Sequence, residues 1–359
     1  MAPLTLRDRD AIITPEGLIF RVFGYSHPPQ AFICDAEYAS ARVFTSNDPR
    51  ALRNGGNQLF YKFYNDEGWK LVSNQFPQYT VFHEMLGQRV VGIKQSDIAE
   101  VRKSEERLRV LVEADAKDEL QDAMQRVLRI VLQGSGLSTA NFGVFGSMLH
   151  GFHHPKFSDI DLIVYGMKEN AKIRETLQAL YADELSGFRN EFETDKVMKG
   201  KQWRLKNYTV KEFIWHQKRK QIYGLFNDAK SGRTIKAEFE PVKTWSEIAS
   251  EYDSKARILR KGWVKITARV TADDDAPFIP SVYGITPLTV LTGTRDALET
   301  VRVISYMEEF RAQAQKDETV CVEGNLEEVV TPNGSFHQIA LTYCPRYYEQ
   351  VLKVTASNP

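Results

Sequence analysis

The sequence has little of what membrane-spanning, secreted or zinc-binding proteins require. No apolar run reaches the roughly 18–20 residues of a transmembrane helix. The N-terminal residues are charged and contain no apolar segment typical of a secretory signal. Three cysteines, Cys34, Cys321 and Cys344, lie far apart without CxxC spacing, so we interpret them as reduced thiols. These absences predict a cytoplasmic protein with no membrane partner and no structural zinc.

The chain also has no net charge, because 47 Lys and Arg balance 47 Asp and Glu. This balance argues against coating of nucleic acid by the whole surface, but it allows a local basic patch. Residues 196–220 contain nine Lys or Arg and a single acid, Glu212. Two interpretations of this basic segment stay open. It is either a solvated face or a polyanion-binding surface, in which Lys218, Arg219 or Lys220 approaches a triphosphate or a nucleic-acid backbone.

Strand patterns dominate the beginning of the chain, helical periodicity starts near residue 96, and strand patterns return after residue 250. We therefore expect an N-terminal mostly β domain (1–95), a central domain that includes two leading helices (96–250) and a C-terminal α+β domain (251–359). The expected fold class is α+β. A small mixed β-sheet with helices forms its centre, flanked by two smaller, mostly β domains.

Several local patterns predict individual elements. Leu59–Tyr64 and Trp69–Val72, separated by Asn-Asp-Glu-Gly, predict a β-hairpin. Apolar residues at helical spacing predict a helix over about residues 117–132 and a long helix over Thr294–Lys316. Strict alternation predicts a strand over Thr234–Val242, with its charged side chains on one face.

The stretch Phe142–Gly166 carries the chemistry. A first apolar run ends in Gly146-Ser147, and a second apolar run follows Asp159 and Asp161. Side chains two residues apart in a strand point to the same face, so these carboxylates lie side by side. They repel each other unless a cation lies between them. The pattern predicts a site for Mg²⁺ or Mn²⁺ beside a turn whose glycine and serine can bind phosphate.

Two metal ions acting on a phosphate chain need about three carboxylates. The strand over Thr234–Val242 offers two on one face, Glu238 and Glu240, and alternation does not separate them. We choose Glu238 as the third ligand and keep Glu240 as the alternative. The predicted catalytic and metal-binding set is therefore Asp159, Asp161 and Glu238, with an NTP as substrate.

The central stretch resembles a known signature, GS…G…SDIDLxV, of the DNA polymerase β-like nucleotidyltransferase superfamily, and most of all its minimal-nucleotidyltransferase branch. The matching segments are Gly146-Ser147, Gly151 and Ser158–Val164. The resemblance covers residues 142–165 closely and about 110–245 loosely. It implies a small mixed sheet, Mg²⁺-dependent transfer of a nucleoside monophosphate from an NTP, and a third carboxylate on a later strand. One departure is His150, where many members have arginine.

Three hypotheses about function follow. The favoured one is transfer to a hydroxyl of a nucleic acid, above all an RNA end, which the flanking domains hold. The second is the same chemistry on a protein side chain (AMPylation) or on a small molecule. The third is a nucleic-acid-binding protein that keeps the fold without catalysis. The basic segment and the aromatic strands favour a large acceptor, without choosing between nucleic acid and protein.

Overall fold

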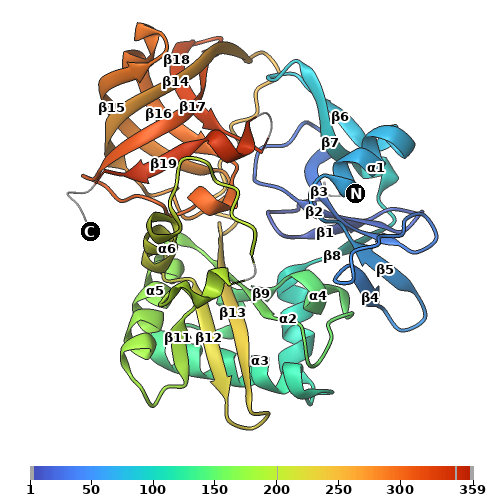
Figure 1. Cartoon of the computed structure of the whole chain (residues 1–359). Helices are drawn as coiled ribbons and strands as arrows, with labels where there is room; N and C mark the ends of the chain where they lie inside the picture. The colour runs from blue at the N-terminus through green and yellow to red at the C-terminus, as the bar shows by residue number, and fades with distance from the viewer. Residues whose placement is uncertain (1–3, 200, 344–345, 356–359) are drawn as a thin grey trace. The chain divides into compact units, whose positions relative to one another are not determined.

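The structure is a computed structural model that describes residues 4–199, 201–343 and 346–355 (Figure 1). By their packing, these residues form two compact units. The first unit comprises the described residues of Met1–His83, Gln88–Arg189 and Ile222–Tyr252, and the second comprises those of Glu84–Gly87, Asn190–Gln221 and Asp253–Pro359. The division into three domains stays a prediction. No helix within the described ranges is long and apolar enough to cross a membrane.

Eight strands in the first unit form an N-terminal sheet. They are β1 (Ala11–Ile13), β2 (Leu18–Val22), β3 (Ala31–Ser40), β4 (Leu52–Asn54), β5 (Leu59–Lys62), β6 (Thr80–His83), β7 (Gln88–Lys94) and β8 (Glu100–Arg102). Six of them follow the order β4-β5-β3-β2-β1-β8, and β7 joins the sheet by pairing with β3 and β6. The long strand β3 therefore connects both parts of this sheet.

The predicted hairpin over residues 59–72 is wrong. Strand β5 pairs with β3 and β4, whereas Glu67–Gln75 forms helix α1. The loop expected at the hairpin tip is instead the start of this helix. The Glu67 carboxylate accepts a hydrogen bond of 2.8 Å from the Tyr64 N–H, which stabilises the turn into the helix.

A second, five-stranded sheet forms the centre of the first unit. Its strands are β9 (Phe142–Val144), β10 (Ile160–Tyr165), β11 (Phe188–Asn190), β12 (Tyr223–Asp228) and β13 (Arg233–Val242). Their order is β11-β12-β13-β10-β9. Strand β10 runs parallel to β13, whereas the β9–β10 and β12–β13 pairs are antiparallel. The sheet is small and mixed, as the sequence predicts.

Helices cover one face of this central sheet (Figure 1). They are α2 (Ser104–Glu113), α3 (Glu119–Ser135) and α5 (Met167–Ala182). The Asp118 side chain caps α3, and the apolar stripe predicted for this helix is buried. Leu162 on β10 and Phe239 on β13 lie in the same core. Because side chains alternate, Asp161 and Glu238 lie on the opposite face.

The second unit contains a closed barrel. Its strands are β14 (Arg257–Ala272), β15 (Ser281–Thr292), β16 (Thr300–Ser305), β17 (Thr319–Thr331), β18 (Gly334–Leu341) and β19 (Val351–Val354). They follow the order β14-β15-β16-β18-β17-β19, and β14 also pairs with β17, which closes the first five. Strands β16 and β18 are parallel. A five-stranded Greek-key barrel of this order is an OB-fold topology.

The long helix predicted over Thr294–Lys316 is wrong. This segment forms a short 3₁₀ turn, η5 (Arg295–Glu299), then β16 and a second turn, η6 (Glu308–Phe310). Four of the six residues in β16 are β-branched, which favours a strand. Val301 is exposed whereas Ile304 is buried, and residues three apart in a strand point to opposite faces, so the apolar spacing that resembled a helix is split between two faces.

Candidate active site

Asp161 and Glu238 lie directly opposite each other on β10 and β13. They are Cα partners in the parallel pair, so their side chains leave the same face of the sheet. Asp159 is exposed on the loop immediately before β10. The charges of both Glu238 and Asp159 act on the Asp161 carboxyl. The structure thus brings together the three carboxylates that the sequence predicts to be catalytic.

These carboxylates carry more negative charge than their surroundings compensate. Burial raises the pKa of the Asp161 carboxyl well above its ordinary value, and Glu238 and Asp159 raise this pKa further. The ammonium groups of Lys62 and Lys236 act in the opposite direction. A bound cation would stabilise the ionised form of such a cluster.

The donor set fits a metal ion that is shared with substrate. Carboxylate oxygens suit Mg²⁺ and Mn²⁺, and Mg²⁺ usually keeps water or phosphate in several positions. Within the described residues, no three His, Cys, Asp or Glu side chains are arranged around a common ion position. Glu238 instead forms an ion pair with Lys236. The site therefore suits an ion held jointly by carboxylates and phosphate, not one enclosed by protein alone.

Gly146 allows the phosphate-binding turn to approach Asp161 closely. Its φ is +60°, and a Cβ atom at this position would lie 2.7 Å from Asp161 Oδ2. The Phe145 N–H donates a hydrogen bond of 3.1 Å to the Asp161 carbonyl oxygen. Ser147 follows in the short helix α4 (Gly146–His150) and is buried. A side chain at position 146 would displace either the turn or the carboxylate.

Two histidines hold the loop that leads to Asp159. His153 Nε2 lies 2.9 Å from the Oδ2 atom of Asp118, the residue that caps α3. The His154 N–H donates to Ser158 Oγ over 2.8 Å, and the Ser158 N–H donates to the His154 carbonyl oxygen over 3.0 Å. Ser158 thus closes a turn directly before Asp159, and both histidines have structural contacts.

His150, where many related proteins have arginine, is a packed and neutral side chain. Its ring stacks on Phe152 at a centroid distance of 5.1 Å and meets the Tyr38 ring edge-on at 5.4 Å. Burial lowers the pKa of His150, although Glu37, 4.0 Å away, raises it. Arg102 Nη1 lies 3.3 Å from His150 Nδ1. His150 therefore does not supply the positive charge of the arginine it replaces.

The N-terminal sheet contributes groups to this site that sequence reasoning missed. Lys62 on β5 is the Cα partner of Tyr38 on β3, and its ammonium nitrogen lies 6.0 Å from the centre of the Tyr38 ring. That ring packs on His150 at the end of α4. The Lys62 charge acts on Asp161. No motif connects residue 62 with residue 161, so only the tertiary structure relates them.

Glu240 takes part in a different interaction. Arg9 Nη2 donates to Glu240 Oε2 over 2.9 Å, and the two side chains are only 3% and 4% exposed. Glu240 lies opposite Ile163, two residues further along the strands than the Asp161–Glu238 pair. This buried ion pair fastens the N-terminal segment to β13. The geometry therefore supports Glu238 as the third carboxylate, in preference to Glu240.

The basic residues expected at the triphosphate lie in the second unit. Lys218 and Arg219 end helix α6 (Val210–Arg219), where Lys218 is exposed. The Arg219 guanidinium pairs with Glu318 at 2.5 Å and lies 4.4 Å from the centre of the Trp215 ring. The buried Lys220 donates to the Glu309 carbonyl oxygen over 2.6 Å. A role for Lys218 or Arg219 at the triphosphate stays a prediction.

Comparison with known proteins agrees with the chemistry of this site. Residues 124–223 match the model of the nucleotidyltransferase domain family, which confirms the resemblance seen in the sequence. This part of the chain is thus a nucleotidyltransferase domain. The whole chain is similar to the uncharacterized protein MJ1086 of Methanocaldococcus jannaschii, with 27% identity over 355 residues, 98% of this chain and 99% of that protein. No solved structure matches the chain significantly.

Proposed function

We propose that the protein transfers a nucleoside monophosphate from an NTP to a hydroxyl group, with an RNA end as the acceptor. The pairing of Asp161 with Glu238 on parallel strands, next to Asp159 and the Gly146 turn, carries this proposal. The nucleotidyltransferase domain supports the reaction class.

In this reaction the acceptor oxygen attacks the α-phosphorus, a new P–O bond forms, and the bond to the pyrophosphate leaving group breaks. We assign Asp159, Asp161 and Glu238 as the residues that would hold Mg²⁺ or Mn²⁺. Such an ion neutralises phosphate charge and lowers the pKa of the attacking hydroxyl when it is bound. The turn at Gly146-Ser147 is the proposed phosphate-binding element.

Positive charge for the triphosphate is available in the first unit without the usual arginine. Lys236 lies on β13 beside Glu238, and Lys62 acts on Asp161 from the N-terminal sheet. Their charges offset part of the negative charge of the carboxylates in the apo protein and would pair with phosphate oxygens when NTP is bound. The N-terminal sheet would then be part of the catalytic site as well as a flanking domain.

The test is transfer of label from α-phosphate-labelled NTPs, in Mg²⁺, to single-stranded RNA, single-stranded DNA and protein. We expect labelled RNA and released pyrophosphate with the wild type, and background transfer with Asp161→Asn. Asp183→Asn is a matched control, because Asp183 is exposed at the end of α5. Transfer to protein alone would favour AMPylation. Absence of transfer to every acceptor, or equal rates for wild type and Asp161→Asn, would refute the catalytic proposal.

A further inference from the structure

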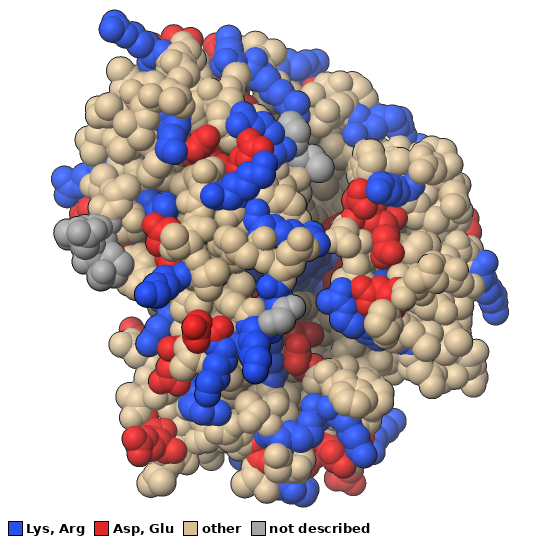
Figure 2. All heavy atoms as spheres, viewed as in Figure 1, with Lys and Arg blue, Asp and Glu red and all other residues tan. Residues whose placement is uncertain are grey.

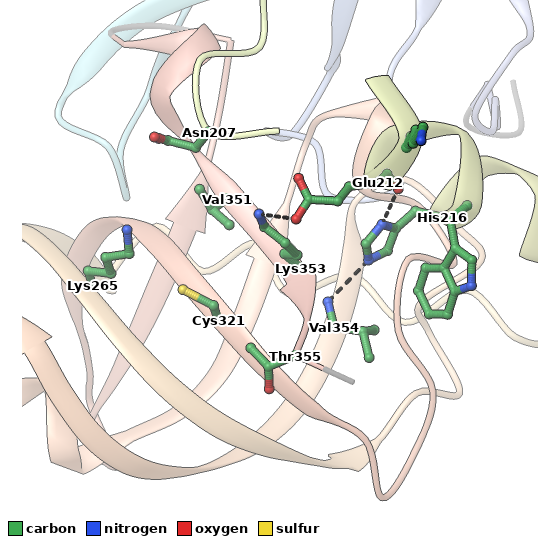
Figure 3. A pocket seen from close by; sticks show the side chains of 11 residues that line it. Asn207, Glu212, His216, Lys265, Cys321, Val351, Lys353, Val354 and Thr355 are labelled. Carbon is green, nitrogen blue, oxygen red and sulfur yellow. Dashed lines mark hydrogen bonds and ion pairs between the residues drawn. The ribbon is translucent and has the colours of Figure 1, made fainter. Parts of the chain in front are cut away.

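The second unit has a cavity of about 650 Å³ between α6 and the barrel strands β14, β17 and β19 (Figure 3). Its volume lies in the range of about 300–1,000 Å³ typical of small-molecule sites. Lys265, Cys321 and Lys353 line it from the barrel, and Lys211 and Trp215 line it from α6. None of these residues belongs to the carboxylate site of the first unit.

The cavity lining is basic. Its three lysines face one lining acid, Glu212. Lys353 Nζ pairs with Glu212 Oε1 at 2.8 Å (Figure 3). Lys265 Nζ pairs with Glu323 Oε2 at 3.1 Å, and Lys211 is exposed. The lining thus keeps positive charge after these ion pairs are formed, which suits an anionic ligand.

One wall of the cavity is fixed by His216. Its Nδ1 donates to the Glu212 carbonyl oxygen over 2.7 Å, and its Nε2 accepts from the Val354 N–H over 3.1 Å (Figure 3). Both ring nitrogens are therefore engaged by backbone, and the ring is neutral. Trp215, the preceding residue, meets the His216 ring edge-on at a centroid distance of 4.7 Å. These contacts tie α6 to β19 and hold an indole in the cavity wall.

The basic segment found in the sequence leads directly into this cavity. Its exposed cations within the described residues include Lys196, Lys199, Lys201, Arg204, Lys206 and Lys211. Arg204 bonds to the Tyr348 hydroxyl over 2.8 Å, and Lys206 pairs with Glu349 at 2.9 Å, so the segment lies against the barrel. Asn207 and Lys211 then enter the cavity lining. A series of cations thus connects the surface with the cavity.

The cavity side of the barrel carries more positive charge than the side formed by β15 and β16. OB-fold proteins commonly bind oligonucleotides on the latter side. There the exposed side chains include Leu288, Leu291 and Val301, and Arg295 lies next to Asp296. Figure 2 shows one face of the molecule, on which Lys and Arg side chains are interspersed with Asp and Glu side chains. Since phosphate contacts dominate the affinity of proteins for nucleic acid, the cavity side is the better polyanion site.

We propose that this cavity and the exposed cations of residues 196–211 bind single-stranded nucleic acid. One nucleotide enters the cavity, where its base stacks on the face of Trp215 opposite the Arg219 guanidinium, and neighbouring phosphates follow the cations of the segment. An aromatic platform beside a basic track is the usual arrangement for single strands. The use of this strand as acceptor rests on the proposed function, whereas its binding does not.

The test is fluorescence anisotropy of a short labelled single-stranded RNA with the full chain carrying Asp161→Asn, which prevents turnover. Trp215→Ala should weaken binding by about 5- to 100-fold. Lys211→Ala and Lys265→Ala should each reduce the slope of log affinity against log salt by about 0.7. Lys316→Ala, which removes an exposed lysine outside the cavity lining, should leave affinity and slope unchanged.

Cys321 reports on occupancy, because its partly exposed thiol lines the cavity. We expect RNA to slow the reaction of Cys321 with N-ethylmaleimide several-fold, measured on its peptide by mass spectrometry, and AMP at the same concentration to have no effect. Protection by AMP alone would replace the proposal with a free-nucleotide site. No RNA binding, or binding unaffected by all three cavity substitutions, would overturn it. Nucleotidyl transfer by the wild type is measured in a separate assay. Failure of the proposed transfer reaction can therefore be told apart from failure of RNA binding in the cavity.

Discussion

Asp161 and Glu238 are direct partners on the parallel strands β10 and β13, although they lie far apart in the chain. Apolar neighbours on the same strands face a core of helices on the other side of the sheet. The fold thus holds two carboxylates next to each other with Asp159 nearby, and burial together with the repulsion from Glu238 and Asp159 raises the pKa of Asp161. Such an arrangement lowers the stability of the apo protein and is typical of a functional site.

Gly146→Ala should lower both stability and transfer activity. Gly136 provides the matched control, because its φ of +66° is close to the +60° of Gly146, while an added Cβ there meets nothing within 4 Å. Both alanines incur the left-handed backbone cost of about 1–2 kcal/mol. Only Gly146→Ala adds a contact with Asp161. Urea unfolding and the transfer assay should therefore show a larger loss for Gly146→Ala, and equal losses would contradict the close approach.

Divalent metal should stabilise the wild-type protein through the carboxylates. We expect Mn²⁺ or Mg²⁺ with NTP to raise the melting temperature, and EDTA to reverse the rise. Asp161→Asn should show a smaller rise. It should also melt higher than the wild type in EDTA at pH 8, since one of the repelling charges is removed. An identical metal-induced rise in both proteins would show that the ion binds elsewhere.

Asp10 should make stability depend on pH. Its carboxylate accepts a hydrogen bond of 3.0 Å from the Arg7 N–H, and burial raises the pKa of Asp10 to about 7. Between about pH 4 and 7 the folded chain keeps a proton that the unfolded chain releases, so this contribution to stability is lost as pH rises. Asp10→Asn should gain at most about 4 kcal/mol at pH 8 relative to the wild type, and little at pH 4. An equal difference in the free energy of unfolding between Asp10→Asn and the wild type at pH 4 and pH 8, measured with urea, would contradict the raised pKa of Asp10.

Lys62→Met should raise the KM for NTP about 10-fold, which corresponds to about 1.4 kcal/mol for one charged hydrogen bond. The reason is loss of the ammonium group that acts on Asp161 from the N-terminal sheet. Lys70→Met is the control, because Lys70 is 60% exposed and pairs with Asp66 on the same helix turn. Steady-state kinetics of both variants check this. An unchanged KM for Lys62→Met would show that Lys62 of the N-terminal sheet does not contribute to NTP binding.

Local patterns in the sequence predicted the parts of the site that depend on neighbouring residues. Alternation placed Asp159 and Asp161 on one face at the start of a strand and Glu238 on the charged face of another, and helical spacing predicted the buried stripe of α3. The choice between Glu238 and Glu240 depends on register and on Arg9, which comes from the beginning of the chain. No local pattern contains that information.

The wrong helix prediction over residues 294–316 and the missed contribution of Lys62 also result from contacts between distant parts of the chain. The segment over residues 294–316 forms β16 because β15 and β18 pair with it, and those strands come from other parts of the chain. The Lys62 contribution likewise depends on how the N-terminal sheet packs on α4. In residues 294–316, strand pairing overrides the helical spacing of the apolar residues. For Lys62, the packing of the N-terminal sheet brings the side chain to the carboxylate site.

The most direct test of the carboxylate site compares transfer activity and stability for Glu238→Gln and Glu240→Gln. Glu238→Gln should lose transfer to background while it keeps the wild-type stability to within about 1 kcal/mol. Glu240→Gln should lose up to about 3–5 kcal/mol of stability, because the buried Arg9 loses its 2.9 Å ion pair with Glu240, although Asp8 remains 3.6 Å from the Arg9 guanidinium.

Both variants are assayed at a temperature at which circular dichroism shows them folded, with α-phosphate-labelled NTP, Mg²⁺ and single-stranded RNA. We expect folded Glu240→Gln to transfer label at close to the wild-type rate and Glu238→Gln not to transfer it. Active Glu238→Gln together with inactive, folded Glu240→Gln would contradict the carboxylate site described for β10 and β13.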